Sequence, residues 1–427
     1  MEKSTLALAI FLIAYALIIS EKIHRTIVAM LGAALVVVLG IISQETAVHH
    51  IDFNTLGLLT GMMVLVSITA QTGVFKYLAI LAAKKANADP GRLLILLCLI
   101  TAVASALLDN VTTVLLVVPV TVSITKQLAV DPIPFLISEI LASNIGGTAT
   151  LIGDPPNIMI GSAVKELTFM AFINNLAAVS TIILLITIAI LYLLYRKQLT
   201  ASEERRRGVM SLDETTAITN IPLLKKCLLV LALTLAGFFG HQLLHLESAT
   251  VALAGAFILL LITVRNHHDL DKVFMHVEWS TIFFFIGLFV LVGGLIETGL
   301  INKLAQQAMA ATGGNVTFSS LLVLWVSAIA SAFVDNIPFV ATMIPLIKDM
   351  GGMGVSNLEP LWWSLALGAC LGGNGTLIGA SANIIVAGMA AQEGHDISFT
   401  GFMKVAFPLM LLSILLSTLY IYLRYLM

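Results

Sequence analysis

Long runs of apolar residues, separated by short polar segments, make up most of this chain. A helix that crosses a bilayer needs about 20 mostly apolar residues. Uninterrupted runs of about that length lie at residues 5–20, 26–42, 55–75, 167–195, 222–240, 249–264, 279–298 and 401–423. The pattern predicts an all-α polytopic membrane protein, with the first run retained as a helix and not cleaved as a signal peptide.

Four further apolar stretches are interrupted by Asp, Asn, Pro and Gly. They lie at residues 93–128, 133–164, 317–347 and 360–390. Non-helical backbone at membrane depth is tolerated only where it is buried in protein or lines a cavity. We interpret 93–128 and 317–347 as re-entrant hairpins, and 133–164 and 360–390 as broken helices.

The composition agrees with a lipid-embedded chain and narrows its chemistry. Hydrophobic residues make up 59% and charged residues 11%, whereas about a quarter of a soluble domain is charged. The three cysteines are far apart and have no metal-type spacing, so neither a disulfide framework nor a metal site is expected. No phosphate-binding loop of the form G-x-x-x-x-G-K-[ST] occurs, and we expect no cofactor and no nucleotide hydrolysis by that route.

The positively charged residues orient the predicted helices. The most polar segment, residues 196–221, is rich in Lys and Arg, and the positive-inside rule places it in the cytoplasm. If the two hairpins do not cross, Lys22 and Arg25 also fall on the cytoplasmic side and both termini lie outside. We therefore expect a multi-pass protein of the inner (plasma) membrane.

The two halves of the chain align at one constant offset in the numbering. The matching segments include Asp109-Asn110 with Asp335-Asn336, Gly146-Gly147 with Gly372-Gly373, and Thr150–Gly153 with Thr376–Gly379. This divides the chain into a first repeat (1–195), a linker (196–221) and a second repeat (222–427). Each repeat would have about five crossings, and an odd number inverts the second copy. Inverted repeats with broken helices are typical of secondary transporters with the substrate near the midplane.

The first pair of breaks places Asp109-Asn110 and Asp335-Asn336 within apolar stretches. Ionisable residues at such depth are costly and are functional by default. We expect Asp109 and Asp335 to lie at hairpin tips and to carry protons in a coupled cycle. The alternative is that each Asp only caps a half-helix while the Asn satisfies free backbone groups.

The second pair of breaks is ASNIGGTATLIGDPPNIMI and ACLGGNGTLIGASANIIV. Gly-Gly permits unwound backbone, and Pro155-Pro156 cannot continue a helix. Uncharged groups at or near these breaks could replace the hydration shell of a solute, or only satisfy the broken backbone. They are Asn144, Thr148, Thr150, Asn157, Asn374, Thr376, Ser381 and Asn383. Asp154, which aligns with Ala380, could be a third titrating group or the cap of the second half-helix, and we favour the cap. Cys370 could contact a thiophilic solute, but we expect it to serve packing.

The charge near the breaks limits the substrate. No Lys or Arg lies close to any of the four breaks along the sequence. A carrier for an anion would usually have one, or would depend on helix N-termini alone. The acidic breaks therefore favour a cation, or a neutral hydrogen-bonding solute that is exchanged for protons.

The segment NIGGTATLIGDPPNIMI, the paired Asp-Asn breaks and the repeated TLIG together resemble the ArsB/NhaD permease group of the ion transporter superfamily. That group includes arsenical pump membrane proteins, sodium/proton antiporters, and relatives of the pink-eyed dilution protein and of plant silicon effluxers. The resemblance implies two hairpins, two broken helices and proton-coupled exchange. It implies site-lining roles for Asp109, Asn110, Asn144, Asp335, Asn336 and Asn383. The Ser-Asn-Thr signatures of the superfamily's dicarboxylate carriers are absent from the hairpin tips, which counts against a di- or tricarboxylate.

The leading hypothesis is export of arsenite, and of antimonite, in exchange for protons. The candidate substrate-binding residues are Asn110, Asn144, Thr148, Asn157, Asn336, Asn374 and Asn383, and the candidate proton-coupling residues are Asp109 and Asp335. The alternatives are sodium/proton antiport and efflux of another neutral oxyacid such as silicic acid. An intramembrane protease and a channel are less favoured, so no enzymatic activity is expected. The expected partners are the solute, protons and the bilayer, with room for a soluble ATPase subunit or a homo-oligomer and no role for nucleic acid.

Overall fold

Every regular element in the described part of the chain is a helix. The computed structural model describes residues 3–20, 22–240 and 246–427. Nine helices within these ranges are long and apolar enough to cross a membrane, and two shorter apolar helices, α2 (Arg25–Val38) and α14 (Ser248–Thr263), accompany them. The predicted fold class, an all-α polytopic membrane protein, is confirmed.

The first half of the chain contains the predicted hairpin and broken helix as two pairs of consecutive helices. Its helices are α1 (Lys3–Ser20), α2, α3 (Gln44–His50), α4 (Phe53–Ala70), α5 (Val74–Lys85), α6 (Pro90–Leu107), α7 (Asn110–Leu128), α8 (Ile133–Thr148), α9 (Pro155–Ala163), α10 (Phe169–Phe172), the π-helical turn η1 (Ile173–Ala177) and α11 (Ala178–Tyr195). The pair α6 and α7 occupies the first hairpin stretch, and α8 and α9 occupy the first broken helix.

The second half repeats this order after the linker. The linker contains α12 (Glu203–Met210) and the 3-10 turn η2 (Glu214–Ala217). The helices that follow are α13 (Ile221–Gly240), α14, α15 (His267–Met275), α16 (Trp279–Glu297), α17 (Leu300–Thr312), α18 (Val316–Phe333), α19 (Asn336–Gly352), α20 (Glu359–Gly372), α21 (Ser381–Gln392), α22 (Phe399–Ile421) and the π-helical turn η3 (Tyr422–Leu426).

The internal repeat is present in the backbone as well as in the sequence. The six helices from α4 to α9 and their counterparts from α16 to α21 begin at the same constant offset, as α4 at Phe53 and α16 at Trp279 illustrate. Gly73 and Gly299 precede α5 and α17 with φ of 77° and 73°. Glycine adopts this left-handed conformation at no steric cost. The two halves therefore share turn geometry as well as helix order.

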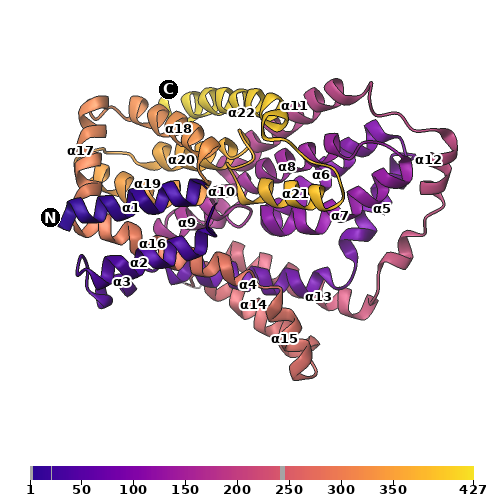
Figure 1. Ribbon diagram of the computed structural model, residues 1–427, viewed down its shortest axis with the longest axis horizontal. Coiled ribbons are helices and arrows are strands. Elements are labelled where there is room, and N and C mark those ends of the chain that lie inside the picture. Colours follow the sequence, from indigo (N-terminus) through magenta and orange to yellow (C-terminus); the bar gives the residue numbers. More distant parts are fainter. Residues whose placement is uncertain (1–2, 21, 241–245) are drawn as a thin grey trace.

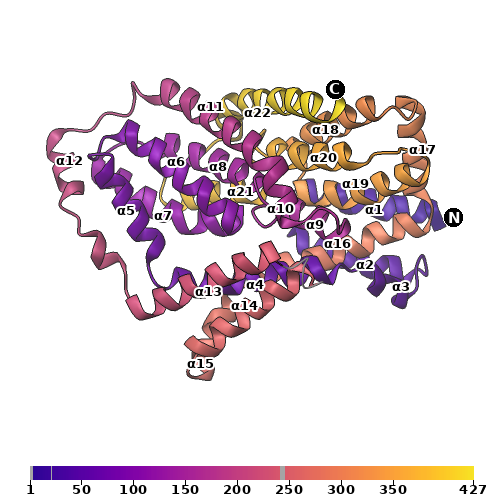
Figure 2. The ribbon, with the colours of Figure 1, turned by 180° about the vertical axis from the view of Figure 1, so that it is seen from behind.

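The helices that carry the breaks of the two repeats lie toward opposite ends of the long axis, whereas α1, α2 and α3 of the first repeat lie at the end occupied by the second. Figures 1 and 2 show α6, α7 and α8 toward one end and α18, α19 and α20 toward the other. Helix α4 packs against α14, and α2 packs against α16. Helix α21 packs against α7, and α9 packs against α19. Each hairpin therefore contacts half of the other repeat's broken helix.

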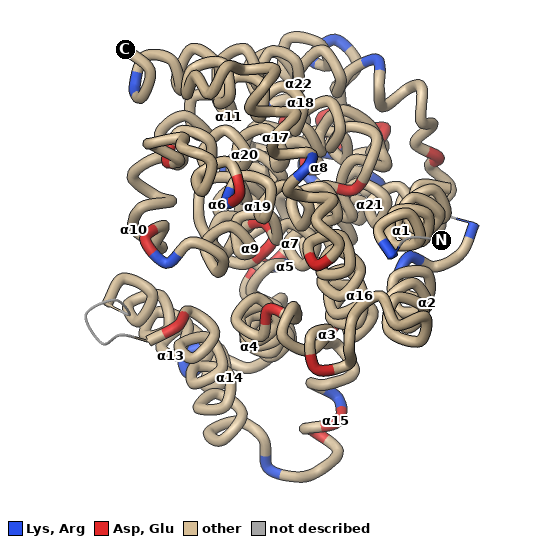
Figure 3. The backbone as a smooth tube through the Cα atoms, turned by 90° about the vertical axis from the view of Figure 1, so that its left-hand side faces the viewer, with Lys and Arg blue, Asp and Glu red and all other residues tan. Residues whose placement is uncertain are grey.

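Charged residues are sparse within the bundle. Figure 3 looks along the long axis and shows acidic positions in the interior near α7 and α9, with most other charges on loops and at the periphery. The buried charged residues in the described part of the chain are all acidic: Asp109, Glu139, Asp154 and Asp335. They lie among buried apolar side chains, where a carboxyl group without partners is costly.

The linker lies against the first repeat. Its Thr219 backbone N–H donates to the Thr72 carbonyl at 3.0 Å, and Lys84 of α5 forms an ion pair with Glu214. Arg206 donates to the Asn87 carbonyl at 2.9 and 3.2 Å. These contacts dock the linker along α5 and the loop that follows it.

Candidate functional site

Four helix N-termini meet at one small inner cavity. Asp109 and Asp335 are the N-cap residues of α7 and α19, and the N-termini of α9 and α21 follow the two TLIG segments. The cavity has a volume of about 20 Å³, and its lining includes Asp109, Asn110, Asp154, Pro155, Asn336 and Ser381. Helix N-termini present free N–H groups and a partial positive charge. A cavity of this size holds about one water molecule.

Glycines let the broken helices approach the hairpins closely. A Cβ atom on Gly146 would lie 2.2 Å from the Ala102 carbonyl oxygen, and one on Gly372 would lie 2.5 Å from the Ala328 carbonyl oxygen. Contacts this short exclude any larger residue without backbone movement. The Gly-Gly pairs therefore set the distance between each hairpin and its own broken helix, and so place the polar groups beside the hairpin tips.

A chain of side-chain amides links the two repeats behind the inner cavity. The Asn110 Nδ2 group donates to Asn144 Oδ1 at 3.1 Å and to Asp154 Oδ1 at 3.2 Å. The Asn144 Nδ2 group donates to Asn374 Oδ1 and to Asn383 Oδ1, both at 2.9 Å. All five residues are at most 3% exposed. The structure thus brings four of the predicted binding residues into one network.

Asn157 and Asn383 also satisfy the backbone of the two breaks. Asn157 Nδ2 donates to the carbonyls of Thr148 and Thr150 at 3.1 and 2.8 Å. Asn383 Nδ2 donates to the carbonyls of Gly373 and Thr376 at 2.8 and 2.9 Å. These bonds match the alternative in which the asparagines hold the unwound segments in shape.

Thr148 and Cys370 lie beside the breaks and do not line the inner cavity. Thr148 Oγ1 donates to the Asn144 carbonyl at 2.7 Å. The buried Cys370 thiol lies 3.5 Å from Asn157 Oδ1. Both groups therefore face structural partners.

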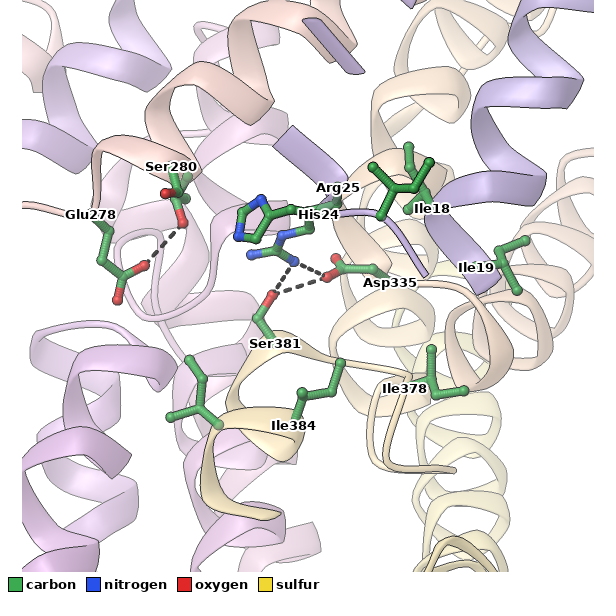
Figure 4. Close-up of a pocket in the computed structure, with 13 residues that line it drawn as sticks. Ile18, Ile19, His24, Arg25, Glu278, Ser280, Asp335, Ile378, Ser381 and Ile384 are labelled. Atoms are coloured by element: carbon green, nitrogen blue, oxygen red, sulfur yellow. Dashed lines mark hydrogen bonds and ion pairs between the residues drawn. The ribbon is translucent and has the colours of Figure 1, made fainter. Parts of the chain in front are cut away.

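The two hairpin tips differ in their charge partners. The Asp109 carboxylate accepts hydrogen bonds from the Thr112 N–H at 2.7 Å and the Thr112 hydroxyl at 2.5 Å, both within its own helix. The Asp335 carboxylate accepts from Arg25 at 2.5 Å and from the Ser381 hydroxyl at 2.9 Å. Arg25 also donates to the Ser381 hydroxyl at 2.6 Å and lies over the Phe284 ring. Figure 4 shows Arg25, Asp335 and Ser381 pointing toward one another.

Arg25 overturns the expectation that no cation lies near the breaks. Arg25 and Asp335 are 310 residues apart in sequence, so spacing along the chain gave no sign of this ion pair. The Arg25 side chain is 25% exposed, and the Asp335 side chain is 8% exposed. Helix α14, the counterpart of α2 in the second repeat, begins at Ser248, so Asp109 has no equivalent cationic partner. A cation therefore does lie beside the breaks, and the charge of the site does not exclude an anionic substrate.

Asp154 occupies the N-cap position of α9 but does not act as a cap. Its side chain makes no hydrogen bond to the first turn of α9, contrary to the expectation. Its Oδ1 accepts from Asn110, while its Oδ2 has no hydrogen-bond partner in the described part of the chain. The Asn336 Nδ2 group, which lines the same cavity, also has no partner there. The Asn336 amide and the Cys370 thiol approach the Asp154 carboxyl without forming a hydrogen bond of normal length. A small polar guest could therefore bind between this buried donor and this buried acceptor.

Two larger cavities adjoin the inner one. The first has a volume of about 450 Å³; it shares Arg25, Glu278, Thr281 and Ser381 with the inner cavity and is otherwise lined mainly by isoleucines. The second is also about 450 Å³, runs along α4 and α7, and shares Met63 and Glu278 with the inner cavity. Both are within the usual size range for small-molecule sites.

Sequence reasoning missed three polar residues in the interior or at its edge. Arg25 and Glu278 lie just before apolar helices, where they resemble ordinary loop residues. Glu139 is 1% exposed in α8 and accepts from the Thr121 hydroxyl at 2.5 Å. A glutamate within an apolar helix is a sign of a functional residue. The counterpart of Glu139 in the second repeat is Leu365, so a comparison of the two repeats does not identify Glu139.

The chain is similar to known transporters over its full length. The family described as CitMHS, citrate transporter, matches residues 15–368. An uncharacterized transporter of Mycobacterium bovis is 45% identical over 428 residues, which cover 99% of both chains. The human P protein is 37% identical over 491 residues, which cover 96% of this chain and 58% of that protein.

A solved structure has the same fold. The YdaH transporter of Alcanivorax borkumensis superposes with a TM-score of 0.60 at 14% sequence identity, covering 99% of this chain and 98% of that one. The predicted family resemblance is confirmed. The chain is therefore a multi-pass membrane transporter that belongs to the CitMHS citrate transporter family, in the ArsB/NhaD-like part of the ion transporter superfamily.

Proposed function

We propose that this transporter exports a small uncharged oxyacid, with arsenite as the leading candidate and antimonite beside it, in exchange for protons. The observation that carries the proposal is the inner cavity, where the buried Asn336 Nδ2 and Asp154 Oδ2 approach each other but make no hydrogen bond of normal length in the described part of the chain. Trivalent arsenic in neutral water is mainly an uncharged triol, which both donates and accepts hydrogen bonds. Such a solute can satisfy an amide donor and a carboxyl acceptor at once.

Proton coupling would use the carboxyl groups at the hairpin tips. In the outward step the solute leaves, and protons then bind Asp109 and Asp335 from the outer side. When Asp335 binds a proton, its attraction to Arg25 falls, which loosens the contact between α2 and α19. The binding of solute and of protons would thereby favour different arrangements of the two repeats.

A carboxylate anion is the second candidate substrate, and Arg25 is the observation that favours it. A guanidinium beside a cavity of about 450 Å³ can bind a carboxylate in bidentate fashion. The description of the family names citrate. Against it, Arg25 is already paired with Asp335. The inner cavity of about 20 Å³ would have to widen for an arsenic triol and would have to open much further to admit citrate.

Everted membrane vesicles from cells that express the chain test these options. The vesicles are energised with a proton gradient, and uptake of arsenite, sodium and citrate is measured with and without an uncoupler. Asp109→Asn and Asp335→Asn are run beside Asp271→Asn, an exposed carboxyl on α15 that serves as the matched control.

We expect arsenite uptake that the uncoupler and both hairpin-tip variants abolish and that Asp271→Asn leaves intact. Sodium-dependent proton release without arsenite uptake would instead identify a sodium/proton antiporter. Citrate uptake that requires Arg25 would support the anion candidate and overturn the neutral one.

A further inference from the structure

Glu278 stands at the junction of the three cavities of the site. It lines the inner cavity of about 20 Å³ and both neighbouring cavities of about 450 Å³. Among the described residues it is the only one that lines all three. A side chain in this place can contact water in either outer cavity and a guest in the inner one.

The Glu278 carboxyl is not needed to cap its helix. It precedes α16, yet its side chain makes no hydrogen bond to the first backbone N–H groups of that helix. The Glu278 carboxyl accepts a hydrogen bond from the Thr281 hydroxyl at 2.9 Å. The group is therefore free to exchange partners without loosening the start of α16.

The corresponding residue of the first repeat shows what a capping carboxyl does. Asp52, which stands at the equivalent position, precedes α4 and accepts from the N–H groups of Asn54 and Thr55 at 3.0 and 3.2 Å. It also accepts from the Ser162 hydroxyl at 2.8 Å. Asp52 lines none of the three cavities. The repeat thus supplies a matched pair of acidic residues, one used for structure and one directed at the site.

The groups around Glu278 are mainly acidic. Asp109, Asp154 and Asp335 approach from the N-termini of α7, α9 and α19, and the cations and imidazoles that line the same cavities are Arg25, His24 and His276. One guanidinium thus stands among four carboxyl groups, and neighbouring carboxylates repel one another. A proton that enters the group reduces the uncompensated negative charge.

We propose that Glu278 is the carboxyl through which protons pass between the outer cavities and the inner site. Glu278 takes a proton from water in an outer cavity and releases it to an inner carboxylate, either directly or through one water in the small cavity. One O–H bond breaks as another forms, and no other reactant is consumed. This inference rests on the proposed proton coupling and adds to it the residue that exchanges protons with solvent.

Two assays on the purified full chain in liposomes separate coupling from solute binding. The first measures solute accumulation driven by a proton gradient. The second measures exchange of labelled for unlabelled solute at equal pH, which requires no net proton movement. The probe is arsenite, or sodium or citrate if one of those gave the vesicle signal.

For Glu278→Gln we expect accumulation to fall about tenfold or more, the scale of a typical coupling energy, while exchange stays close to that of the unchanged protein. Glu278→Asp should keep both activities, with a changed pH profile of accumulation. Asp52→Asn keeps a good capping residue and should leave the ratio of the two activities unchanged.

The inference is overturned if Glu278→Gln still accumulates solute normally, or if both activities fall in parallel. Should Glu278→Gln not fold, the pH profile of Glu278→Asp decides, and an unchanged profile counts against the proposal. If the unchanged protein shows exchange but no proton-driven accumulation, the proposed function fails instead.

Discussion

The tips of the two hairpins hold equivalent residues that differ in backbone conformation and in charge partners. Asp109 and Asp335 occupy equivalent N-cap positions in the two repeats. Asp109 finds its partners within its own helix, at Thr112. Asp335 also caps its own helix, through the Ile337 N–H at 3.1 Å, but in addition it is bound by Arg25 of α2 and Ser381 of α21. The repeat therefore supplies the order of the helices and the paired Asp-Asn residues, whereas Arg25 and Ser381 make the second tip different from the first.

This difference has a physical consequence for stability. A carboxylate that is bound only within its own helix turn keeps its hydrogen bonds when that helix moves relative to its neighbours. A carboxylate that is paired across helices ties those helices together, and breaking a buried pair leaves an uncompensated charge. We therefore expect substitutions at the second tip to have larger effects than matched substitutions at the first.

Removing Arg25 should have the largest effect. Arg25→Ala leaves the buried Asp335 carboxylate without its cation, a loss of about 3 kcal/mol for a pair of this kind. At the other tip, Thr112→Val removes one hydroxyl donor from Asp109 and should cost about 1 kcal/mol. Thermal unfolding of the purified protein in detergent compares the two.

The double variant Arg25→Ala with Asp335→Asn provides the control for that prediction. It removes both charges and should recover part of the stability lost in Arg25→Ala alone. Equal losses at the two tips, or no recovery in the double variant, would show that the ion pair does not hold the helices together.

Substitutions at Asn110 and Asn336, the equivalent asparagines at the two tips, should affect stability and transport differently. Asn110→Ala removes the hydrogen bonds to Asn144 and Asp154 and should cost roughly 1 to 3 kcal/mol, because buried partners are left unsatisfied. Asn336→Ala removes a side chain whose Nδ2 has no partner in the described part of the chain. It should leave the unfolding temperature nearly unchanged and weaken solute transport.

Unfolding temperature and initial uptake rate, measured on the same preparations, check this prediction. A large loss of stability in Asn336→Ala would contradict it, since that result would require a structural partner for the amide. Normal uptake in Asn336→Ala would remove this residue from the binding site.

The turns before α5 and α17 give a smaller contrast between the repeats. Gly73→Ala and Gly299→Ala each force a residue with a Cβ atom into the left-handed region, at about 1 to 2 kcal/mol. A Cβ atom at Gly73 would also lie 1.9 Å from the Ala217 carbonyl oxygen of the linker, whereas nothing lies within 4 Å at Gly299. Gly73→Ala should therefore displace the linker as well. Faster cleavage by trypsin within 196–220 in that variant alone would demonstrate it.

The smallest expected effect is the response of the linker to pH. The hydrogen bond from Lys84 lowers the pKa of Glu214 below its ordinary value of 4.5. The contact therefore contributes to docking above that value and is lost as pH falls through the lowered pKa. Hydrogen-exchange protection factors of the linker amides, which correct for the intrinsic pH dependence of exchange, should be steady from neutral pH down to about 5 and should decrease in more acidic solution. Glu214→Gln should show little further change on acidification.

The sequence predicted the helices and their breaks closely, because both depend on local signals. The apolar runs, the Asp-Asn tips, the Gly-Gly pairs and Pro155-Pro156 are each readable within a few residues. The constant offset between the repeats then predicted which segments correspond. The amide network from Asn110 to Asn383 lies among residues that the breaks had already marked.

The remaining parts of the site depend on contacts between distant segments. Arg25 and Glu278 each stand at the start of a helix and look like solvated loop residues. Only the packing of α2 against α16, and of α21 against α7, brings them to the centre. Asp154 looked like a helix cap because it precedes Pro155, yet Asn110 offers its side chain a different partner. No local pattern encodes such choices.

The packing of each repeat against the other also has a consequence for biosynthesis. Arg25 is made early and must wait for Asp335, which is synthesised 310 residues later. At a translation rate of about 5 to 20 residues per second that delay is roughly 15 to 60 s. During this time the N-terminal half sits at the translocon with its polar groups unmatched, and α7 lacks the α21 segment that will cover it. Assembly of this transporter is thus completed only after the last third of the chain has emerged from the ribosome.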